Sequence, residues 1–251
     1  MENLNGKVAV VTGGARDIGK AISISLAKAG AKVIVNYFES ESQGDETVAA
    51  IEKLGGTAVA VYADVTKQAD IDAMVKTTLD HFGPKIDILV NVAGGLFARK
   101  SIEEMDEDFY NLVMDVNLKS VFLVTKAIKP HMEKGGAIIN FASQAGRDGG
   151  GPGAAIYAAS KGAVITYTRA LAKEFGPQGV RVNALCPGMI ATKFHDDFTK
   201  DEVREKVAGS TPLRREGEAE EVADLVVYLA SEQSSFITGN NIDINGGLAF
   251  S

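Results

Sequence analysis

The sequence contains one cysteine, three histidines and no tryptophan. The single cysteine, Cys186, cannot form an internal disulfide, and its place in the apolar run VNALCPG predicts a buried, unreactive thiol. The histidines, the cysteine and the carboxylates form no cluster with metal-ligand spacing. We therefore expect no catalytic metal.

Long apolar runs and excess basic charge are also missing. No stretch approaches the roughly 20 apolar residues that a bilayer-spanning helix needs, and no basic segment followed by an apolar run precedes Val8. Lysine and arginine number 26 against 33 aspartate and glutamate residues, which gives a net charge of −7. Such a charge repels nucleic acids and anionic membranes. We expect a cytoplasmic protein without a nucleic-acid or membrane partner.

What the sequence does have is an alternation of short β-branched runs with helical stretches. The runs are continuous rather than alternating, which is typical of strands that helices cover on both faces. They are KVAVVTG, AKVIVNY, TAVAVYAD, IDILVNVAG, GAIINFAS, VRVNALCPG and NNIDING. This order predicts an α/β fold with a doubly wound parallel sheet of about seven strands. Because no linker-like tract interrupts the chain, we expect a single domain over residues 1–251.

One segment, residues 189–218, breaks this alternation. It lies between the sixth expected strand and the next helix, at a position where open α/β sheets often carry a substrate lid. A surface helical hairpin is the alternative. The segment contains Met189, Phe194, His195 and Phe198, an apolar mixture suited to a modest organic substrate, with His195 interpreted as an ordinary surface histidine.

The stretch VAVVTGGARDIGKAISISLAKAG, residues 8–30, is typical of a strand, a glycine-rich turn and a helix. Such a turn offers backbone N–H groups and the positive end of a helix dipole to a dinucleotide pyrophosphate. The spacing GxGxxG is absent, however, and Asp17 places a carboxylate inside the turn. The turn alone is weak evidence for a cofactor.

Further motifs follow this turn in a fixed order. They are ADV at 63–65, NVAG at 91–94, VNLKSVF with Asn117, INFAS with Ser143, YAASK at 157–161, PGMIAT at 187–192 and the late ITGNNIDINGG. Together with Thr12, Gly13 and Gly19 of the turn, they resemble the classical short-chain dehydrogenase/reductase family over essentially the whole chain. The resemblance implies a Rossmann-like fold and an NAD(P)-dependent oxidoreductase.

The chemistry of three of these residues can be argued directly. Tyr157 and Lys161 are spaced i,i+4 on an expected helix, so both side chains lie on one face. A neighbouring ammonium would bring the phenol pKa from about 10 toward neutrality, which suits a general acid for a ketone oxygen and a general base in reverse. Ser143, just after a strand, can donate to the carbonyl oxygen where negative charge develops. A YxxxK pair alone is more often a solvated helix face, but its context favours catalysis.

The family resemblance implies further roles. Asn117 would stabilise a helix distortion that holds a water in a proton relay, and Lys161 would also bind the nicotinamide ribose. Asp64 and Val65 would lie at the adenine, Ala93 and its neighbours at a ribose, and Thr192 at the carboxamide. The implied cofactor contacts are Thr12, Gly13, Arg16, Asp17, Ile18, Gly19, Tyr37, Ser40, Asp64, Val65, Asn91, Ala93, Gly94, Tyr157, Lys161, Pro187, Gly188, Ile190 and Thr192.

The choice of cofactor depends on the end of the second strand, where an acid selects NAD(H). The aligned residue, Tyr37, is not acidic, whereas Arg16 stands where NADP-preferring members of the family often have a base, and Ser40 could donate to a phosphate. Glu39 is the contrary observation, because it follows Gly19 at about the spacing of an NAD-selecting acid. We expect Glu39 in a solvated loop and favour NADP(H) over NAD(H).

Asp17 is predicted to act as the N-cap of the helix that runs toward Ala29, because aspartate is a strong N-cap residue. Its carboxylate would then accept from the first N–H groups of the helix without facing the phosphates. Arg16 beside it could offset the negative charge.

The ending GEAEEVADLVVYLASEQSSFITGNNIDINGG is similar to that of 3-oxoacyl-[acyl-carrier-protein] reductases, which implies reduction of a ketone, possibly a β-keto thioester of fatty acid biosynthesis. An acidic carrier protein would need a basic docking patch, yet the expected region offers only Lys134 and His131, and Gln178 stands where an arginine is usual. Two alternatives stay open: a dehydrogenase of a sugar, polyol or other secondary alcohol, and a non-catalytic cofactor-binding sensor or scaffold. The resemblance also implies a homotetramer.

Overall fold

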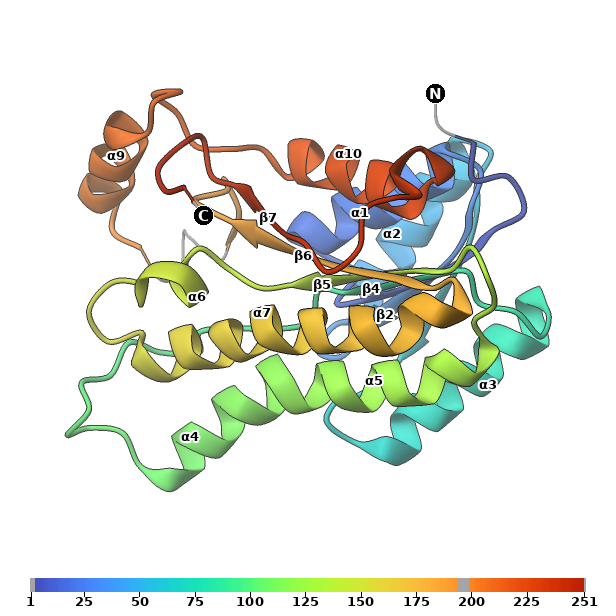
Figure 1. Ribbon diagram of the computed structural model, residues 1–251, viewed down its shortest axis with the longest axis horizontal. Coiled ribbons are helices and arrows are strands. Elements are labelled where there is room, and N and C mark those ends of the chain that lie inside the picture. Colours follow the sequence, from blue (N-terminus) through green and yellow to red (C-terminus); the bar gives the residue numbers. More distant parts are fainter. Residues whose placement is uncertain (1–2, 194–198, 251) are drawn as a thin grey trace.

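A computed structural model describes residues 3–193 and 199–250 and shows the expected α/β fold. Seven parallel strands form one sheet in the order β3-β2-β1-β4-β5-β6-β7 (Figure 1). The prediction of a doubly wound parallel sheet is confirmed. The strands are β1 (Val8–Thr12), β2 (Lys32–Tyr37), β3 (Thr57–Tyr62), β4 (Ile88–Asn91), β5 (Ala137–Phe141), β6 (Arg181–Pro187) and β7 (Asn241–Ile244).

Helices cover both faces of this sheet. Figure 1 shows α1, α2 and α10 on one face and α3, α5 and α7 on the other. Their bounds are α1 (Asp17–Lys28), α2 (Glu41–Lys53), α3 (Gln68–Phe82), α4 (Glu107–Met114), α5 (Ser120–Ile128), α6 (Ala145–Asp148), α7 (Ala155–Phe175), α9 (Asp201–Ser210) and α10 (Ala219–Ala230). None of the helices within the described residues is long and apolar enough to cross a membrane.

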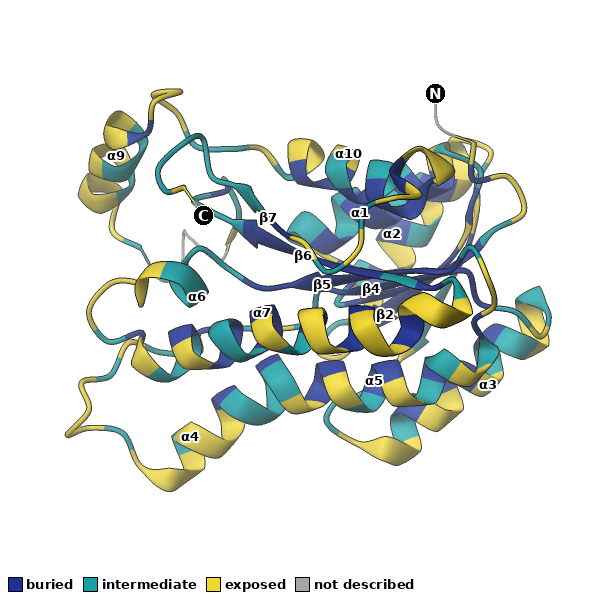
Figure 2. Cartoon of the chain, viewed as in Figure 1, coloured by how far each residue is buried: buried dark blue, intermediate teal, exposed yellow. Residues whose placement is uncertain are grey.

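The continuous apolar runs are explained by this double cover. Every residue of β1 and of β5 is buried, whereas the edge strands β3 and β7 are only partly buried (Figure 2). Residues of one strand contribute to both layers: Val11 packs toward α1 and α10, and Val10 packs toward α3 and α5. Most side chains on either face of a central strand are therefore apolar.

All strands are parallel, so their carboxyl ends meet at one edge of the sheet. Strand β1 ends at Thr12, β4 at Asn91, β5 at Phe141 and β6 at Pro187. The glycine-rich turn, NVAG, Ser143 and PGMIAT each lie at or just after one of these ends. The topology thus gathers segments that are far apart in the sequence.

Candidate active site

The glycine-rich turn connects β1 to α1 and is closely packed. Gly13 has φ +62°, and its N–H donates to the Asn36 side-chain oxygen at 3.0 Å. A Cβ on Gly19 would lie only 2.0 Å from the Gly13 carbonyl oxygen. These two positions therefore require glycine, because the start of α1 lies directly on the turn.

Asp17 does not cap α1, so that prediction is wrong. The helix begins at Asp17 itself, the N-cap is Arg16, and Asp17 has a left-handed φ of 49°. Its carboxylate Oδ1 instead accepts from the backbone N–H of Lys193 at 3.1 Å, across from the turn. The glycine that the family pattern has at this position adopts a left-handed backbone easily. Aspartate adopts it at some cost in free energy, which the hydrogen bond of its side chain partly offsets. The carboxylate thus links the turn to the segment after β6.

Replacing this carboxylate gives a first prediction. We expect Asp17→Gly to tighten NADPH binding about tenfold, because it removes a negative charge from a phosphate-binding turn, and to raise the free energy of unfolding by about 1 kcal/mol by relieving the left-handed backbone. Fluorescence titration and thermal unfolding measure the two effects.

Asp17→Asn is the matched control for that experiment. Asparagine tolerates the same backbone conformation and still offers an oxygen to Lys193, but it carries no charge. If only the charge opposes the cofactor, both variants gain affinity equally. Unchanged affinity in both would contradict the electrostatic argument.

The end of β4 is held by side chains that the family pattern assigned to the cofactor. Thr12 Oγ1 accepts from the N–H groups of Val92 and Ala93, at 3.1 and 3.2 Å. The Asn91 amide nitrogen donates to Asn140 at 2.9 Å and to Thr125 at 3.3 Å. Thr12 is 2% exposed and Asn91 is 3% exposed. Both side chains point into the protein and shape the loop, and the contact of these two residues with the cofactor stays a prediction.

Asn117 lies in a π-helical turn, Asp115–Lys119, between α4 and α5. Its side chain is fully buried, its oxygen accepts from Gly95 N at 3.0 Å, and its nitrogen donates to Gly95 O at 2.8 Å and Val113 O at 3.0 Å. The widened turn provides room for this side chain to reach the loop after β4. Asn117 therefore joins the helical layer to that loop.

Ser143, Tyr157 and Lys161 lie close together near Asn117. Ser143 hydrogen-bonds the Tyr157 hydroxyl, and the Lys161 ammonium lies 5.8 Å from the centre of the Tyr157 ring. Lys161 Nζ is buried and donates to the Phe141 carbonyl at 2.8 Å. A Cβ on Gly94 would lie 2.7 Å from the Asn117 oxygen and 2.9 Å from Lys161 Nζ. The predicted set of Asn117, Ser143, Tyr157 and Lys161, from three segments of the chain, thus lies together beside the loop that follows β4.

The predicted electrostatics of this set need correction. Burial raises the pKa of Tyr157 above its usual value, and a hydrogen bond from Ser143 opposes that rise. The pKa of Lys161 is lowered to about 8, also by burial. The ammonium donates to a carbonyl, and the net direction of the Tyr157 pKa is upward, opposite to the fall that we predicted. Tyr157 is consequently a neutral phenol at physiological pH, ready to donate a proton.

The adenosine end of the turn carries the residues expected to select the cofactor. Arg16 lies 3.9 Å from Asp17 and 3.9 Å from Glu39, with 54% of its side chain exposed. Glu39 follows the end of β2 and is 73% exposed, as expected for a solvated loop. The ring of Tyr37 packs against Tyr62, with ring centres 6.0 Å apart.

The structure also places four further residues that were predicted to contact the cofactor. Ser40 is the N-cap of α2 and accepts from Gln43 N at 3.4 Å. The Asp64 carboxylate accepts from Thr66, at 2.9 Å from its N–H and 2.7 Å from its hydroxyl. Val65 is buried in the core. The Ile18 side chain packs against the other core layer, so only its backbone faces the turn.

The end of β6 lies against the segment that follows β5. Pro187 O accepts from Gln144 N at 3.0 Å, and Gly188 N donates to Ile244 O at 3.0 Å. The Ile190 side chain is buried in the core, and the Thr192 hydroxyl donates to Ile190 O at 3.1 Å. These contacts bring the PGMIAT segment beside Ser143.

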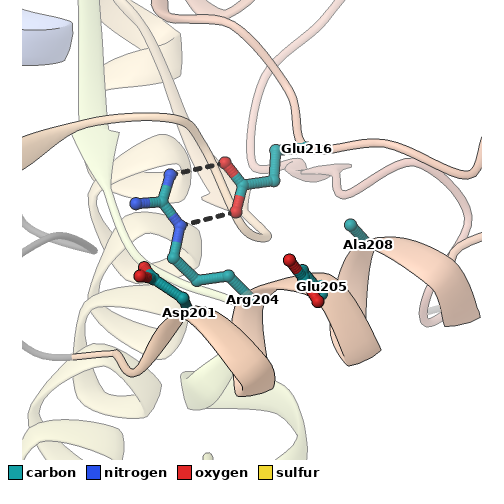
Figure 3. Close-up of a pocket in the computed structure, with 5 residues that line it drawn as sticks. All are labelled: Asp201, Arg204, Glu205, Ala208 and Glu216. Carbon is teal, nitrogen blue, oxygen red and sulfur yellow. Dashed lines mark hydrogen bonds and ion pairs between the residues drawn. The ribbon is translucent and has the colours of Figure 1, made fainter.

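The proposed lid segment contains a helix, α9. A bidentate ion pair joins Arg204 of α9 to Glu216, with both N–O distances 2.7 Å (Figure 3). A pocket lies on this helix and does not include Ser143 or Tyr157; its lining residues are Asp201, Arg204, Glu205, Ala208 and Glu216. Met189 is the first residue of this segment, whereas Phe194, His195 and Phe198 lie outside the described residues.

Sequence reasoning missed several polar residues that build the site. Asn36 and Asn140 are buried near the carboxyl ends of β2 and β5, and Asn183 is buried within β6. Each is a lone asparagine in a β-branched run, which was the available signal. Arg147, after Ser143, had no such signal because its partner lies on β7.

The residues present fit a dinucleotide. The turn is tight enough that a Cβ on Gly13 would lie 3.1 Å from Ala93 Cα, and the N-cap Arg16 makes no side-chain hydrogen bond to α1. Backbone N–H groups at the start of α1 are thereby left to a phosphate. Within residues 3–193 and 199–250, no group of three or more His, Cys, Asp or Glu side chains could hold a metal ion.

Comparison with known proteins identifies the family. Residues 13–249 match the family model described as Enoyl-(Acyl carrier protein) reductase. The 3-oxoacyl-[acyl-carrier-protein] reductase of Synechocystis sp. is 43% identical, with 99% of each chain covered. The chain belongs to the short-chain dehydrogenase/reductase family. As a member of this family, it is an oxidoreductase that works with a nicotinamide cofactor.

Proteins with other names are nearly as similar. Glucose 1-dehydrogenase 2 of Bacillus subtilis is 38% identical and covers 98% of this chain and 96% of its own length. The crystal structure of a blue fluorescent protein from a metagenomic library, in complex with NADPH, superimposes with a TM-score of 0.92 at 35% identity, covering 99% of this chain and 100% of the other. The family is thus clear, and its members differ in substrate.

Proposed function

We propose that this short-chain dehydrogenase/reductase reduces a ketone to a secondary alcohol with NADPH, in the manner of a 3-oxoacyl reductase. The observation that carries the proposal is the grouping of Ser143, Tyr157 and Lys161 beside the loop that follows β4. When bound, the nicotinamide supplies the hydride. Asn117 completes the grouping through its bonds to Gly95.

Each side chain has a distinct task in this proposal. Ser143 donates a hydrogen bond to the substrate carbonyl and so stabilises the negative charge that develops on its oxygen. Tyr157 gives its proton to that oxygen, because burial keeps the phenol neutral. Lys161, whose pKa is about 8, places a positive charge close to the phenol and can return a proton to Tyr157. In alcohol oxidation the proton returns to Tyr157.

The preference for NADPH over NADH rests on Arg16. Its guanidinium is half exposed at the adenosine end of the turn, where it can bind a 2′-phosphate. Glu39 competes for the same guanidinium at 3.9 Å, but it is largely solvated. The NADPH complex of the similar blue fluorescent protein supports this preference.

Several wider features belong to the same proposal. We infer a single domain over residues 1–251, with 189–218 as a lid and a β-keto thioester as one acceptable substrate. We also infer a cytoplasmic homotetramer; exposed Ile102, Leu112 and Phe122 on α4, α5 and the preceding loop support an oligomer.

A dehydrogenase of a sugar or other alcohol is the second candidate. The similarity to glucose 1-dehydrogenase 2, at 38% identity, favours it. The carrier-protein partner is less supported, because Gln178 accepts from Lys129 and no arginine stands there.

The test has two steps. Fluorescence titration with NADPH and NADH measures cofactor preference, with Arg16→Gln as a control that should weaken NADPH binding alone. Initial rates with acetoacetyl thioesters, free ketones, enoyl thioesters, sugars and polyols then define the reaction. Faster reduction of β-keto substrates supports the proposal. Preference for NADH with sugar oxidation supports the second candidate, and selective enoyl reduction would contradict both.

A further inference from the structure

Helix α6 carries an arginine for which the proposed mechanism has no task. Arg147 Nε donates to the Asp243 carboxylate at 3.1 Å, and its Nη2 donates to the Asn241 carbonyl at 2.5 Å. Both partners are on β7, the edge strand. The Arg147 and Asp243 side chains are only 18% and 15% exposed. An ion pair this sheltered is held more firmly than one at the surface.

The other side of α6 lies directly against α7. A Cβ on Gly146 would be 2.8 Å from the Gly162 nitrogen and 2.8 Å from the Lys161 carbonyl carbon. This contact brings the backbone of α6 onto the turn of α7 that bears Lys161. Helix α6 therefore lies between β7 on one side and the catalytic turn of α7 on the other.

The same short helix determines the direction of the Ser143 hydroxyl. Strand β6 fixes the backbone on either side of Ser143, because Ala142 N donates to Leu185 O at 2.9 Å and Gln144 N donates to Pro187 O at 3.0 Å. The hydroxyl oxygen, however, accepts from Ala145 N at 3.1 Å, inside α6. A shift of α6 would turn the hydroxyl even if the strand stayed in place.

We propose that Arg147 is a positioning residue, which together with Asp243 anchors α6 on β7 and so holds the Ser143 hydroxyl against Tyr157. The pair does not touch the reacting atoms. It acts through the α6 turn, whose opposite face is already fixed by the contact of Gly146 with α7. The inference rests on the proposed function for its kinetic consequence, but its structural consequence can be measured separately.

Because Ser143 contacts Tyr157, a displaced Ser143 hydroxyl should change the ionisation of Tyr157. Tyr157 faces Ser143 from α7, Cys186 lies beside it on β6 and near Lys161, and Arg147 and Asp243 lie near Cys186. The hydrogen bond from Ser143 to the Tyr157 hydroxyl lowers the phenol pKa. Loss of its correct position should therefore make Tyr157 harder to ionise.

The experiment compares Arg147→Met with the wild-type holoenzyme. We expect kcat to fall about 30-fold, because small misplacements of catalytic groups are costly, while the NADPH Kd changes less than about twofold. The phenolate absorbance of Tyr157, obtained by subtracting a Tyr157→Phe titration, should appear at higher pH. Arg147→Lys, which keeps one charged donor, should recover part of kcat.

Arg181→Met is the matched control. Arg181 is also partly buried, and it bonds Leu229 O, Ser231 O and Ser234 Oγ, but it begins β6 at the opposite end of the sheet. This variant should lose thermal stability without moving kcat per folded protein or the ionisation of Tyr157. The same profile in Arg147→Met would overturn the inference.

A double-mutant cycle tests the pair itself. If Arg147 acts through Asp243, then Arg147→Met combined with Asp243→Ala should lower kcat no more than about threefold beyond either single variant. If the kcat losses of the two single variants multiply in the double variant, the two residues act independently and the proposed anchor is contradicted. If Arg147→Met does not fold, Arg147→Lys and Asp243→Ala carry the same test. A wild type without turnover would defeat the proposed function, whereas the Tyr157 ionisation would still decide the positioning role.

Discussion

Tyr157→Phe is expected to lower kcat about a thousandfold while leaving NADPH binding nearly unchanged. Phenylalanine keeps the ring beside Lys161 but removes the proton donor, and loss of a general acid costs about 100- to 10,000-fold. Because the phenol is neutral up to alkaline pH, the wild-type reduction rate should not decline between pH 6 and about 8 through Tyr157 ionisation. Initial rates and fluorescence titration check both parts.

Tyr167→Phe provides the control on the same helix. Tyr167 packs between two core clusters, away from Ser143, and burial likewise raises its pKa. Its variant should retain turnover within about twofold. A Tyr157→Phe enzyme that still reduces ketones at the wild-type rate would remove the mechanism.

Lys161→Met is expected to stop turnover and yet stabilise the protein. Burial lowers the pKa of Lys161 from 10.5 to about 8, so at pH 7 the folded state carries a disfavoured charge worth about 3 kcal/mol. Methionine removes that penalty but leaves the Phe141 carbonyl without its donor, which costs about 1 to 2 kcal/mol. The net gain should be about 1 to 2 kcal/mol in the free energy of unfolding at pH 7, measured by denaturant titration.

The stability of the wild type should also depend on pH through Lys161. Between pH 8 and 10.5 the unfolded lysine binds a proton that the folded one has released, so wild-type stability gains from this group as pH rises through that window. The gain should be absent in Lys161→Met. Lys173→Met, at an exposed position of α7, should change stability by no more than about 0.5 kcal/mol. If Lys161→Met is less stable than wild type at pH 7, burial of the charge is not the dominant cost.

The sequence predicts the sheet well because its signals are local. Each strand is a continuous apolar run, and every run appears as a strand, since helices bury both faces. The grouping of Ser143, Tyr157 and Lys161 was also foreseeable, because Ser143 follows a strand and the other two share a helix face.

What the sequence does not predict depends on partners distant along the chain. The direction of the Asp17 carboxylate is decided by Lys193, and that of the Lys161 ammonium by the Phe141 carbonyl. Local rules favoured an N-cap for the first and a phenolate partner for the second. Both interpretations were wrong because a tertiary hydrogen bond competed with the local one.

The strand order also implies that the glycine-rich turn and the surroundings of Ser143 form at different times during synthesis. Strands β1 to β4 lie side by side and come from the first 91 residues, so the glycine-rich turn can fold early. Ser143 must wait for β6, which binds the backbone beside it, and its anchor Asp243 arrives only with β7. A nascent chain would therefore gain its nucleotide-binding half first and its catalytic geometry last, which keeps an incomplete chain from acting as an enzyme.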